Sequence, residues 1–230
     1  MGKIHVIIVA GGSGSRFGAD VPKQYCLLEG RPVLMHTIDA MREAVPFGEM
    51  LLVISRDMHP LWQSLCRSSA FESPRVVYGG PTRASSVRNA LMSIGAVSPD
   101  DVVLIHDGAR PLVDRVTVAN VLDKLLGSRP DGVIPVVPVT DSIRLITDSG
   151  SRPVDRSLYR AVQTPQGFYL GELMQAYERP EEKGWTDDAS VMASAGKTDI
   201  VLACGSPENI KITNPIDIDL AAAILNRHKK

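Results

Sequence analysis

The chain of 230 residues is long enough for one large domain, and 44% hydrophobic and 22% charged residues are typical of a soluble globular protein. A net charge of −1 argues against a general basic surface for nucleic acid or for a membrane. Three cysteines without a CxxC pair favour free, buried thiols over zinc or disulfides. Because the first apolar run is too short for a signal peptide, we predict a cytoplasmic protein.

Four apolar runs predict the strands of a sheet that is covered on both faces. They are rich in Val and Ile and nearly continuous rather than alternating, which is typical of parallel strands. The runs span residues 4–10, 50–56, 101–107 and 132–139.

Amphipathic stretches between these runs predict helices. Residues 31–45 place Leu34, Ile38 and Met41 on one face, and residues 82–97 place a similar apolar set on one face. Thr82 and Asp114 are predicted N-caps. The alternation of strands and helices predicts a single α/β domain over residues 1–230, with a Rossmann-like, mostly parallel sheet flanked by helices.

The alternation stops at about residue 138. Residues 139–163 alternate in polarity around the turn "TDSGSR" and predict a protruding β-hairpin arm. Such an arm needs a surface to lie against, and a second subunit is one candidate. Further on, Thr186 predicts a helix start, and Asn214 with Pro215 predicts the N-cap and first turn of the last helix.

The stretch "AGGSGSRFGADVPKQY", residues 10–25, follows the first predicted strand. A glycine-rich turn at this point directs backbone N–H groups at a phosphate. It is not a Walker A loop, because Lys23 follows Pro22, and it is not a dinucleotide fingerprint, because Phe17 replaces the last glycine. Arg16 and Lys23 add positive charge beside bare backbone, which suits phosphoryl or nucleotidyl transfer.

Two further polar residues follow the strand at 101–107. Asp107 ends that strand at the carboxyl edge, where open α/β sheets bind ligands. Arg110 lies three residues on and is expected to pair with Asp107 or to contact substrate. His106 is expected to pack at the strand end rather than to catalyse.

The glycine loop resembles the nucleotide-binding signature of sugar nucleotidyltransferases, and the resemblance extends along nearly the whole chain. The segments in order are "GGPTRASSVRNAL", "VLIHDGARPLV", "VDRSLYRAVQTPQGF", "TDDASVM" and "ENIKITNPIDIDLA". Together they resemble the 2-C-methyl-D-erythritol 4-phosphate cytidylyltransferase family. Gly108 and Ser142 depart from the family pattern, where Ala and Thr are usual.

The resemblance implies attack by methylerythritol phosphate on the α-phosphorus of CTP, with loss of pyrophosphate. No side-chain base is required, because the attacking phosphate has a second pKa of about 6 and is already largely a dianion. The family implies catalytic roles for five residues and a Mg²⁺ ion that the phosphates mainly hold, with Asp107 near the metal. The five are Arg16, Lys23, Asp107, Arg156 and Lys211.

The resemblance also implies two binding sets. Small residues and backbone amides are expected to hold the nucleotide: Ala10, Gly11, Gly12, Gly14, Gly80, Arg83 and Ser86. The methylerythritol phosphate is expected to contact Asp107, Arg110, Ser142, Arg156, Thr164, Thr186 and Lys211. In the family the arm embraces a second subunit and delivers its arginine there, which implies a homodimer with Arg156 shared across the interface.

Two alternatives remain open at the level of sequence. One is a ribitol-5-phosphate cytidylyltransferase of the same fold, although "DRSLYRAVQTPQGF" and "TDDASVM" favour the methylerythritol enzyme. The other is a non-catalytic nucleotide-binding module, which would need the glycine loop but not the four cations Arg16, Lys23, Arg156 and Lys211 together. Neither nucleic acid nor a membrane is an expected partner.

Overall fold

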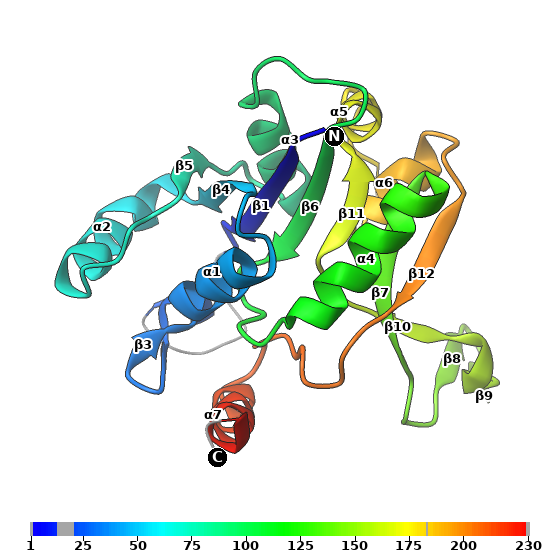
Figure 1. Cartoon of the computed structure of the whole chain (residues 1–230). Helices are drawn as coiled ribbons and strands as arrows, with labels where there is room; N and C mark the ends of the chain where they lie inside the picture. Colours follow the sequence, from blue (N-terminus) through cyan, green and yellow to red (C-terminus); the bar gives the residue numbers. More distant parts are fainter. Residues whose placement is uncertain (1, 13–20, 183, 229–230) are drawn as a thin grey trace.

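The computed structural model describes residues 2–12, 21–182 and 184–228, and its centre is an eight-stranded sheet (Figure 1). The strand order is β10-β7-β11-β6-β1-β4-β5, with β12 beside β7. The strands of this sheet are β1 (Ile4–Ala10), β4 (Glu49–Ile54), β5 (Arg75–Tyr78), β6 (Val102–Asp107), β7 (Gly132–Pro138), β10 (Arg160–Val162), β11 (Gln166–Tyr169) and β12 (Ile200–Cys204).

The sheet is mostly parallel, as predicted. β1 pairs in parallel with β4 and β6, β4 with β5, and β7 with β12, whereas β11 and β10 are antiparallel to their neighbours. The four predicted strands correspond to β1, β4, β6 and β7. The short strands β5, β11 and β12 were not predicted.

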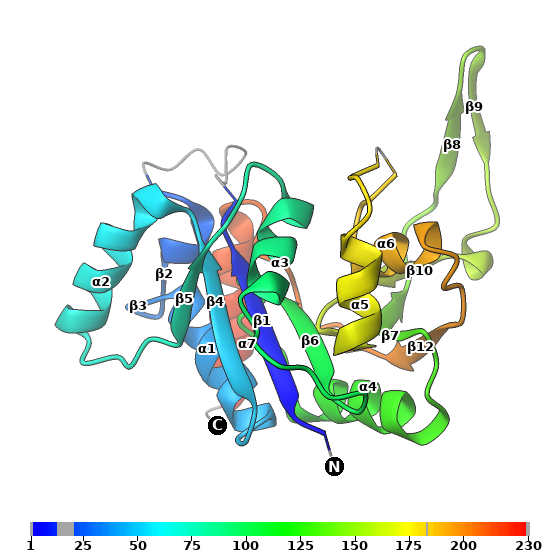
Figure 2. The ribbon, with the colours of Figure 1, turned by 90° about the horizontal axis from the view of Figure 1, so that it is seen from above.

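Helices cover both faces of the sheet (Figures 1 and 2). One core layer joins α1 and α4 to β1 and β6, and the other joins α3, α5 and α6 to the opposite faces of the same strands. Successive residues of β1 divide between the layers, because side chains alternate along a strand. The helices are α1 (Val33–Ala44), α2 (His59–Ser68), α3 (Arg83–Met92), α4 (Arg115–Ser128), α5 (Leu170–Tyr177), α6 (Asp188–Ser194) and α7 (Ile216–His228).

The apolar face predicted for α1 is confirmed, because Leu34, Ile38 and Met41 are fully buried. The predicted helix at 82–97 is too long: α3 ends at Met92, and Gly95 lies in the irregular segment that follows. Glycine disfavours a helix because it loses the most backbone freedom on ordering.

Hydrogen bonds at the helix starts test the predicted N-caps. The Thr82 side chain accepts from the N–H of Ser85, and the Asp114 side chain accepts from the N–H of Thr117, so both caps are confirmed. The cap of α6 is Asp187 rather than Thr186, because its carboxylate accepts from the N–H of Ser190.

At the start of α7 the predicted cap is one residue early. The helix begins at Ile216, and Asp217 accepts hydrogen bonds from the N–H groups of Thr213 and Asn214. The carboxylate of Asp217, in the first turn, therefore accepts from the two N–H groups that precede the helix. The prediction had the reverse arrangement, in which the Asn214 side chain accepts from N–H groups of the first turn.

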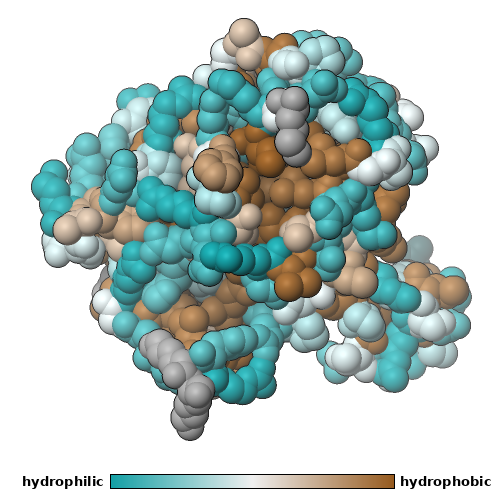
Figure 3. All heavy atoms as spheres, in the orientation of Figure 1, coloured by the Kyte–Doolittle hydropathy of each residue, from teal (hydrophilic) through white to brown (hydrophobic). Residues whose placement is uncertain are grey.

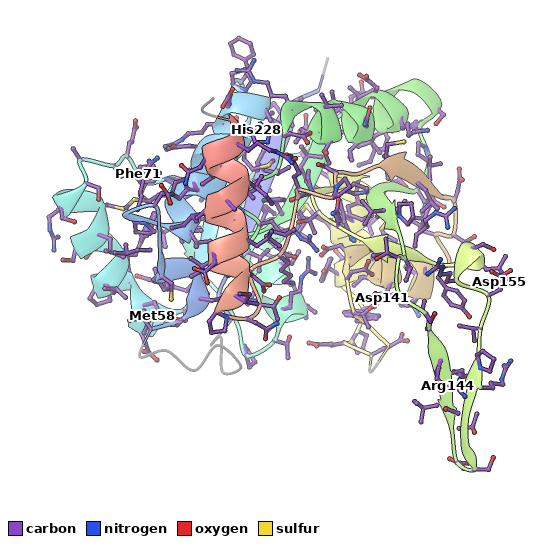
Figure 4. The ribbon with its side chains drawn as sticks, turned by 90° about the horizontal axis from the view of Figure 1, so that it is seen from below. Met58, Phe71, Asp141, Arg144, Asp155 and His228 are labelled. Atoms are coloured by element: carbon purple, nitrogen blue, oxygen red, sulfur yellow. The ribbon has the colours of Figure 1, made fainter. Side chains whose placement is uncertain are left out.

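The region predicted as an arm contains a hairpin of β8 (Arg144–Thr147) and β9 (Gly150–Pro153) that projects from the body (Figure 2). Every residue of both strands is exposed, and Arg144 is seen well away from the central sheet in Figure 4. The chain returns through the turn at Arg156–Leu158 to β10, which pairs with β7. In Figure 3 the projection carries both hydrophobic and hydrophilic residues.

The three cysteines are free, as predicted, but the prediction that they are buried was wrong: Cys26 and Cys66 are partly exposed and Cys204 is exposed. Within the described part of the chain, no helix combines the length and the apolar character that crossing a membrane requires.

Candidate functional site

The sheet reverses its strand order between β1 and β6, and their carboxyl ends meet there. From β1 the order runs outward through β4 to β5, and β6 lies on the other side. The register pairs Val9 with Asp107, and Gly11 and Gly12, which follow β1, line the same hollow as that aspartate. Open α/β sheets bind their ligands at such a reversal of strand order. Asp107 therefore lies at the edge where a ligand was expected from the sequence.

A hollow of about 510 Å³ lies over this edge. It contains most of the predicted nucleotide-binding residues together with the predicted catalytic residues Lys23, Asp107 and Lys211. The predicted residues that line it are Ala10, Gly11, Gly12, Lys23, Gly80, Arg83, Ser86, Asp107 and Lys211. Gly14 and Arg16 lie outside the described residues.

Side chains order the backbone of this hollow. Gln24 is buried and donates hydrogen bonds to the carbonyls of Ala10 at 2.7 Å and Gly12 at 3.1 Å. Ser86 accepts from the N–H of Gly80 at 3.1 Å. A side chain on Gly80 would collide with Ser85, since its Cβ would lie 2.3 Å from Oγ. Glycine is therefore required where the chain passes close to the start of α3.

A second hollow, of about 280 Å³, adjoins the first. It contains Arg110, Thr164 and Thr186 from the predicted substrate set, together with residues that sequence reasoning missed. The missed residues are Val162, Gln163, Gln166 and Asp187. Arg83, Asp107 and Lys211 line both hollows and thus stand at their junction.

Asp107 carries a buried negative charge surrounded by three cations. Its Oδ2 lies 2.9 Å from Nζ of Lys211 and 3.3 Å from Nε of Arg110, and its Oδ1 lies 3.8 Å from Nε of Arg83. Burial by itself would raise the pKa of Asp107, but these three positive charges hold that pKa below its usual range. The junction therefore combines one ionised carboxylate with an excess of positive charge.

Arg110 connects this carboxylate to the segment between β12 and α7. Its Nη1 donates to the carbonyl of Asn209 at 2.8 Å, while Nε faces Asp107. Asn209 in turn donates from Nδ2 to the carbonyl of Thr164 at 2.8 Å. The pairing of Arg110 with Asp107 confirms the first of the two alternatives predicted for Arg110.

His106 is fully buried behind the site and acts as a neutral hydrogen-bonding group. The carbonyl of Arg110 can only accept, so Nε2 of His106 carries the proton, at 3.2 Å. Nδ1 then accepts from the Thr164 hydroxyl at 3.0 Å, and that hydroxyl accepts from the N–H of Asp107. Burial lowers the pKa of His106 to about 4, which agrees with a packing role.

The family model described as 2-C-methyl-D-erythritol 4-phosphate cytidylyltransferase (IspD) matches residues 4–227. The chain belongs to this family. It is 46% identical to the enzyme of that name from Porphyromonas gingivalis, over 97% of this chain and 98% of the relative. It is 42% identical to the Bacteroides thetaiotaomicron enzyme, over 97% and 100%.

Solved structures agree with the fold. The 4-diphosphocytidyl-2C-methyl-D-erythritol synthase of Anaerococcus prevotii superposes with a TM-score of 0.81 at 28% identity, covering 98% of this chain and 99% of the other. The cytidylyltransferase of Thermus thermophilus gives 0.75 at 30% identity, over 97% and 99%.

Two residues of the predicted substrate set of this cytidylyltransferase family lie away from both hollows. Ser142 and Arg156 are exposed on the segment that carries the hairpin, and Arg156 donates to the carbonyl of Thr140. Neither lines the junction around Asp107. A single chain thus brings together most of the predicted set without its arm arginine.

Among the described residues, no cluster of three or more His, Cys, Asp or Glu side chains could hold a metal ion. Of the residues that the structure describes, Asp107 is the one carboxylate that lines the first hollow. Its Oδ1 lies 3.8 Å from the nearest cation, farther than its Oδ2 at 2.9 Å. Mg²⁺ is commonly held by one or two carboxylates plus substrate phosphates and water. The residues present therefore fit a magnesium ion that arrives with the triphosphate, with Asp107 as its protein ligand.

Asp188 is fully buried and lines neither hollow. Gln24, Gln166 and Asn209 were missed. A buried Gln or Asn carries no local sequence signal, because its partners come from distant strands. The position of Gln24 next to Lys23, within the glycine segment, was the one available clue.

Proposed function

We propose that this chain transfers CMP from CTP to 2-C-methyl-D-erythritol 4-phosphate, giving 4-diphosphocytidyl-2-C-methyl-D-erythritol and pyrophosphate in the non-mevalonate route to isoprenoids. A substrate phosphate oxygen forms the new bond to the α-phosphorus, and the bond to the β-phosphate bridging oxygen breaks. The single observation that carries the proposal is the junction of two hollows at Asp107, Arg83 and Lys211. Membership of the IspD family supports it.

The first hollow supports binding of the nucleotide. Gly11, Gly12 and Gly80 expose backbone at the ends of β1 and β5, where a base or a phosphate can approach closely. Lys23 lies in the same lining and is proposed, with Arg16, to stabilise the charge that grows on the triphosphate. Mg²⁺ would neutralise further negative charge on the phosphates, with Asp107 as its ligand.

The second hollow supports binding of the phosphorylated polyol. Lys211 and Arg110 place positive charge at its inner end, beside the first hollow. Thr164 and Thr186 add hydroxyls to the same lining. Two anions that approach each other need this positive charge, and a dianionic phosphate needs no base to remove a proton.

The arm supports the homodimer. Arg156 and Ser142 lie outside both hollows of their own chain. The hairpin before Arg156 exposes Ile146, and Leu158 in the turn is also exposed. We propose that this arm lies on a second copy and delivers Arg156 to the phosphate subsite of that copy. We also propose that the protein acts in the cytoplasm.

The decisive assay measures pyrophosphate release with CTP and methylerythritol phosphate, in parallel with CTP and ribitol 5-phosphate and with CTP alone. Release with the first pair alone is expected. Faster release with ribitol 5-phosphate would show that this polyol phosphate is the acceptor instead. Binding of CTP without any release of pyrophosphate would show that the protein is a non-catalytic nucleotide-binding module. Lys23→Ala should lower turnover by about 10²–10³-fold without unfolding the protein.

Mixing subunits tests the shared site. Inactive Arg156→Ala and inactive Lys23→Ala subunits should recover part of the activity when mixed, because one of the two sites in a mixed dimer then has both cations. No recovery in dimers whose mixed composition is verified would contradict donation across the interface.

A further inference from the structure

One guanidinium is shared unequally between two carboxylates at the junction of the hollows. Nη2 of Arg83 lies 2.6 Å from Oδ2 of Asp188, whereas its Nε lies 3.8 Å from Oδ1 of Asp107. Arg83 belongs to the linings of both hollows, and 29% of its side chain is exposed. It therefore presents charge to ligands on one side while a buried anion holds it on the other.

That anion is fully enclosed. Asp188 is the first residue of α6, with a side-chain exposure of 0%, and it contributes to neither hollow. Its Oδ1 accepts a hydrogen bond of 2.6 Å from the hydroxyl of Tyr177, at the end of α5. Both carboxylate oxygens thus have a short, directed partner. A buried charge in such surroundings is stable only while its counter-ion stays in place.

The roles within this triad are fixed. Burial raises the pKa of Tyr177, and the adjacent charge of Asp188 raises it further, so the phenol remains a donor. Burial by itself would lower the pKa of Arg83, but the charge and hydrogen bond of Asp188, together with the charge of Asp107, raise that pKa and keep the guanidinium charged. Trp185 packs edge-on against the Tyr177 ring, with centroids 5.9 Å apart, and limits its movement.

If Asp188 did not pair with Arg83, the nearest other carboxylate for that guanidinium would be Asp107. Oδ1 of Asp107 already lies 3.8 Å from its Nε, while Oδ2 is engaged by Lys211 at 2.9 Å and by Arg110 at 3.3 Å. A small rotation would give Arg83 and Asp107 a full ion pair. Both oxygens of Asp107 would then be occupied by cations of the protein, and Arg83 would withdraw from the phosphates.

We propose that Asp188, oriented by Tyr177, is a positioning residue that holds Arg83 at the junction of the two hollows and keeps it from closing onto Asp107. The inference deepens the proposed function, since it assigns Arg83 to the phosphates of both substrates at once. Asp188 acts through Arg83 and touches neither substrate.

The test uses Asp188→Asn, which preserves shape but removes the charge. We expect kcat/KM to fall by about 10²-fold, because a misplaced contact group of this kind has effects of that size. KM should rise for both CTP and methylerythritol phosphate, since Arg83 borders both hollows. Asp101→Asn is the matched control: that buried carboxylate lies at the other end of β6, and its loss should leave both KM values unchanged.

A double-mutant cycle separates positioning from a merely structural role. Because Asp188 acts through Arg83, adding Asp188→Asn to Arg83→Ala should change kcat/KM by less than about twofold. A structural role for Asp188 in supporting α6 would instead add its full loss to that of Arg83→Ala. Additive losses, or wild-type KM values in Asp188→Asn, would overturn the proposal.

Tyr177→Phe provides a second variant if Asp188→Asn does not fold. It removes one hydroxyl and retains the ion pair, so both KM values should rise in the same direction but by less, about threefold to tenfold, the effect of one hydrogen bond. Unchanged KM values in this variant would overturn the orienting role of Tyr177.

A readout independent of turnover separates this proposal from the proposed function. In a crystal structure of Asp188→Asn, Nε of Arg83 should lie within hydrogen-bond distance of Oδ1 of Asp107, and in the wild type it should remain paired with Asp188. An Arg83 that stays in place in the variant would overturn the proposal. If the wild-type protein released no pyrophosphate, the proposed function would be wrong, but the position of Arg83 in the two crystal structures would still test the role of Asp188.

Discussion

The strand β6 is flanked by two buried aspartates with different partners. Asp101 precedes the strand, and its two oxygens accept from the backbone N–H groups of Lys3 at 2.7 Å and Ser98 at 2.8 Å. Asp107 ends the strand and faces the side chains of Lys211, Arg110 and Arg83. The residue type, the strand and the depth of burial are alike, with exposures of 3% and 8%.

The two aspartates differ in whether a ligand could displace their hydrogen-bonding partners. Backbone N–H groups are fixed by the fold, so Asp101 is permanently satisfied and ties the N-terminal segment to the start of β6. Charged side chains rotate, so the partners of Asp107 can turn from the carboxylate to incoming phosphates. Burial of a carboxylate alone therefore does not identify a site; Asp107 differs from Asp101 because its partners are side chains that line the hollows.

The Asp107→Asn substitution tests the difference between the two aspartates with the largest expected loss of turnover. Removing the charge frees three cations to pair with the triphosphate in an unproductive way and removes the proposed metal ligand. Turnover should fall by about 10²–10³-fold, the usual effect of losing one group that contacts the reacting phosphates. Pyrophosphate release measures it, and turnover within a few fold of wild type would contradict the assigned role.

Lys211→Met should have a smaller effect, on the binding of the phosphorylated polyol that Lys211 is proposed to hold. It retains the apolar stem and removes the ammonium that lies 2.9 Å from Asp107. KM for methylerythritol phosphate should rise by about 10–100-fold, as expected for one hydrogen bond to a charged group. Lys197→Met is the control, because that lysine pairs with Glu172 and Asp131 outside both hollows.

Asp101→Asn should have the opposite phenotype. The amide retains one acceptor but gives one backbone N–H a donor in place of an oxygen, so the free energy of unfolding should fall by about 1–3 kcal/mol. Turnover at 25 °C should equal that of the wild type, because this residue is at the far end of β6. Urea denaturation with pyrophosphate assays on the same sample measures both; a loss of turnover in folded protein would refute the contrast.

The smallest expected effect is on the pH dependence of stability. The hydrogen bond from Ser98, aided by that from Lys3, holds the pKa of Asp101 below its ordinary value. The unfolded chain therefore binds more protons than the folded one just below pH 4, and stability is lost as the pH falls through that region. Urea midpoints between pH 5 and 3 should decline less steeply in Asp101→Asn, while an unchanged slope would contradict the assignment.

Local signals explain which parts of the fold were predictable from the sequence. The strands β1, β4, β6 and β7 were found because continuous Val and Ile runs mark strands buried on both faces. Thr82 and Asp114 were found because a cap depends on donors only a few residues away. By contrast, β5 and β11 have four residues each, too few to establish a period, and antiparallel pairing of β11 beside β6 has no local cause.

By itself the sequence determined that a bare glycine loop with cations follows the first strand, and its motifs indicated the family. The tertiary structure alone decided that Arg83, Asp107 and Lys211 stand together at the junction of two hollows, and that Asp188 lies behind them rather than in the pocket. The pairing of Arg83 with Asp188 spans 105 residues of sequence. Sheet order and helix packing bring such residues within reach, and no short-range pattern encodes them.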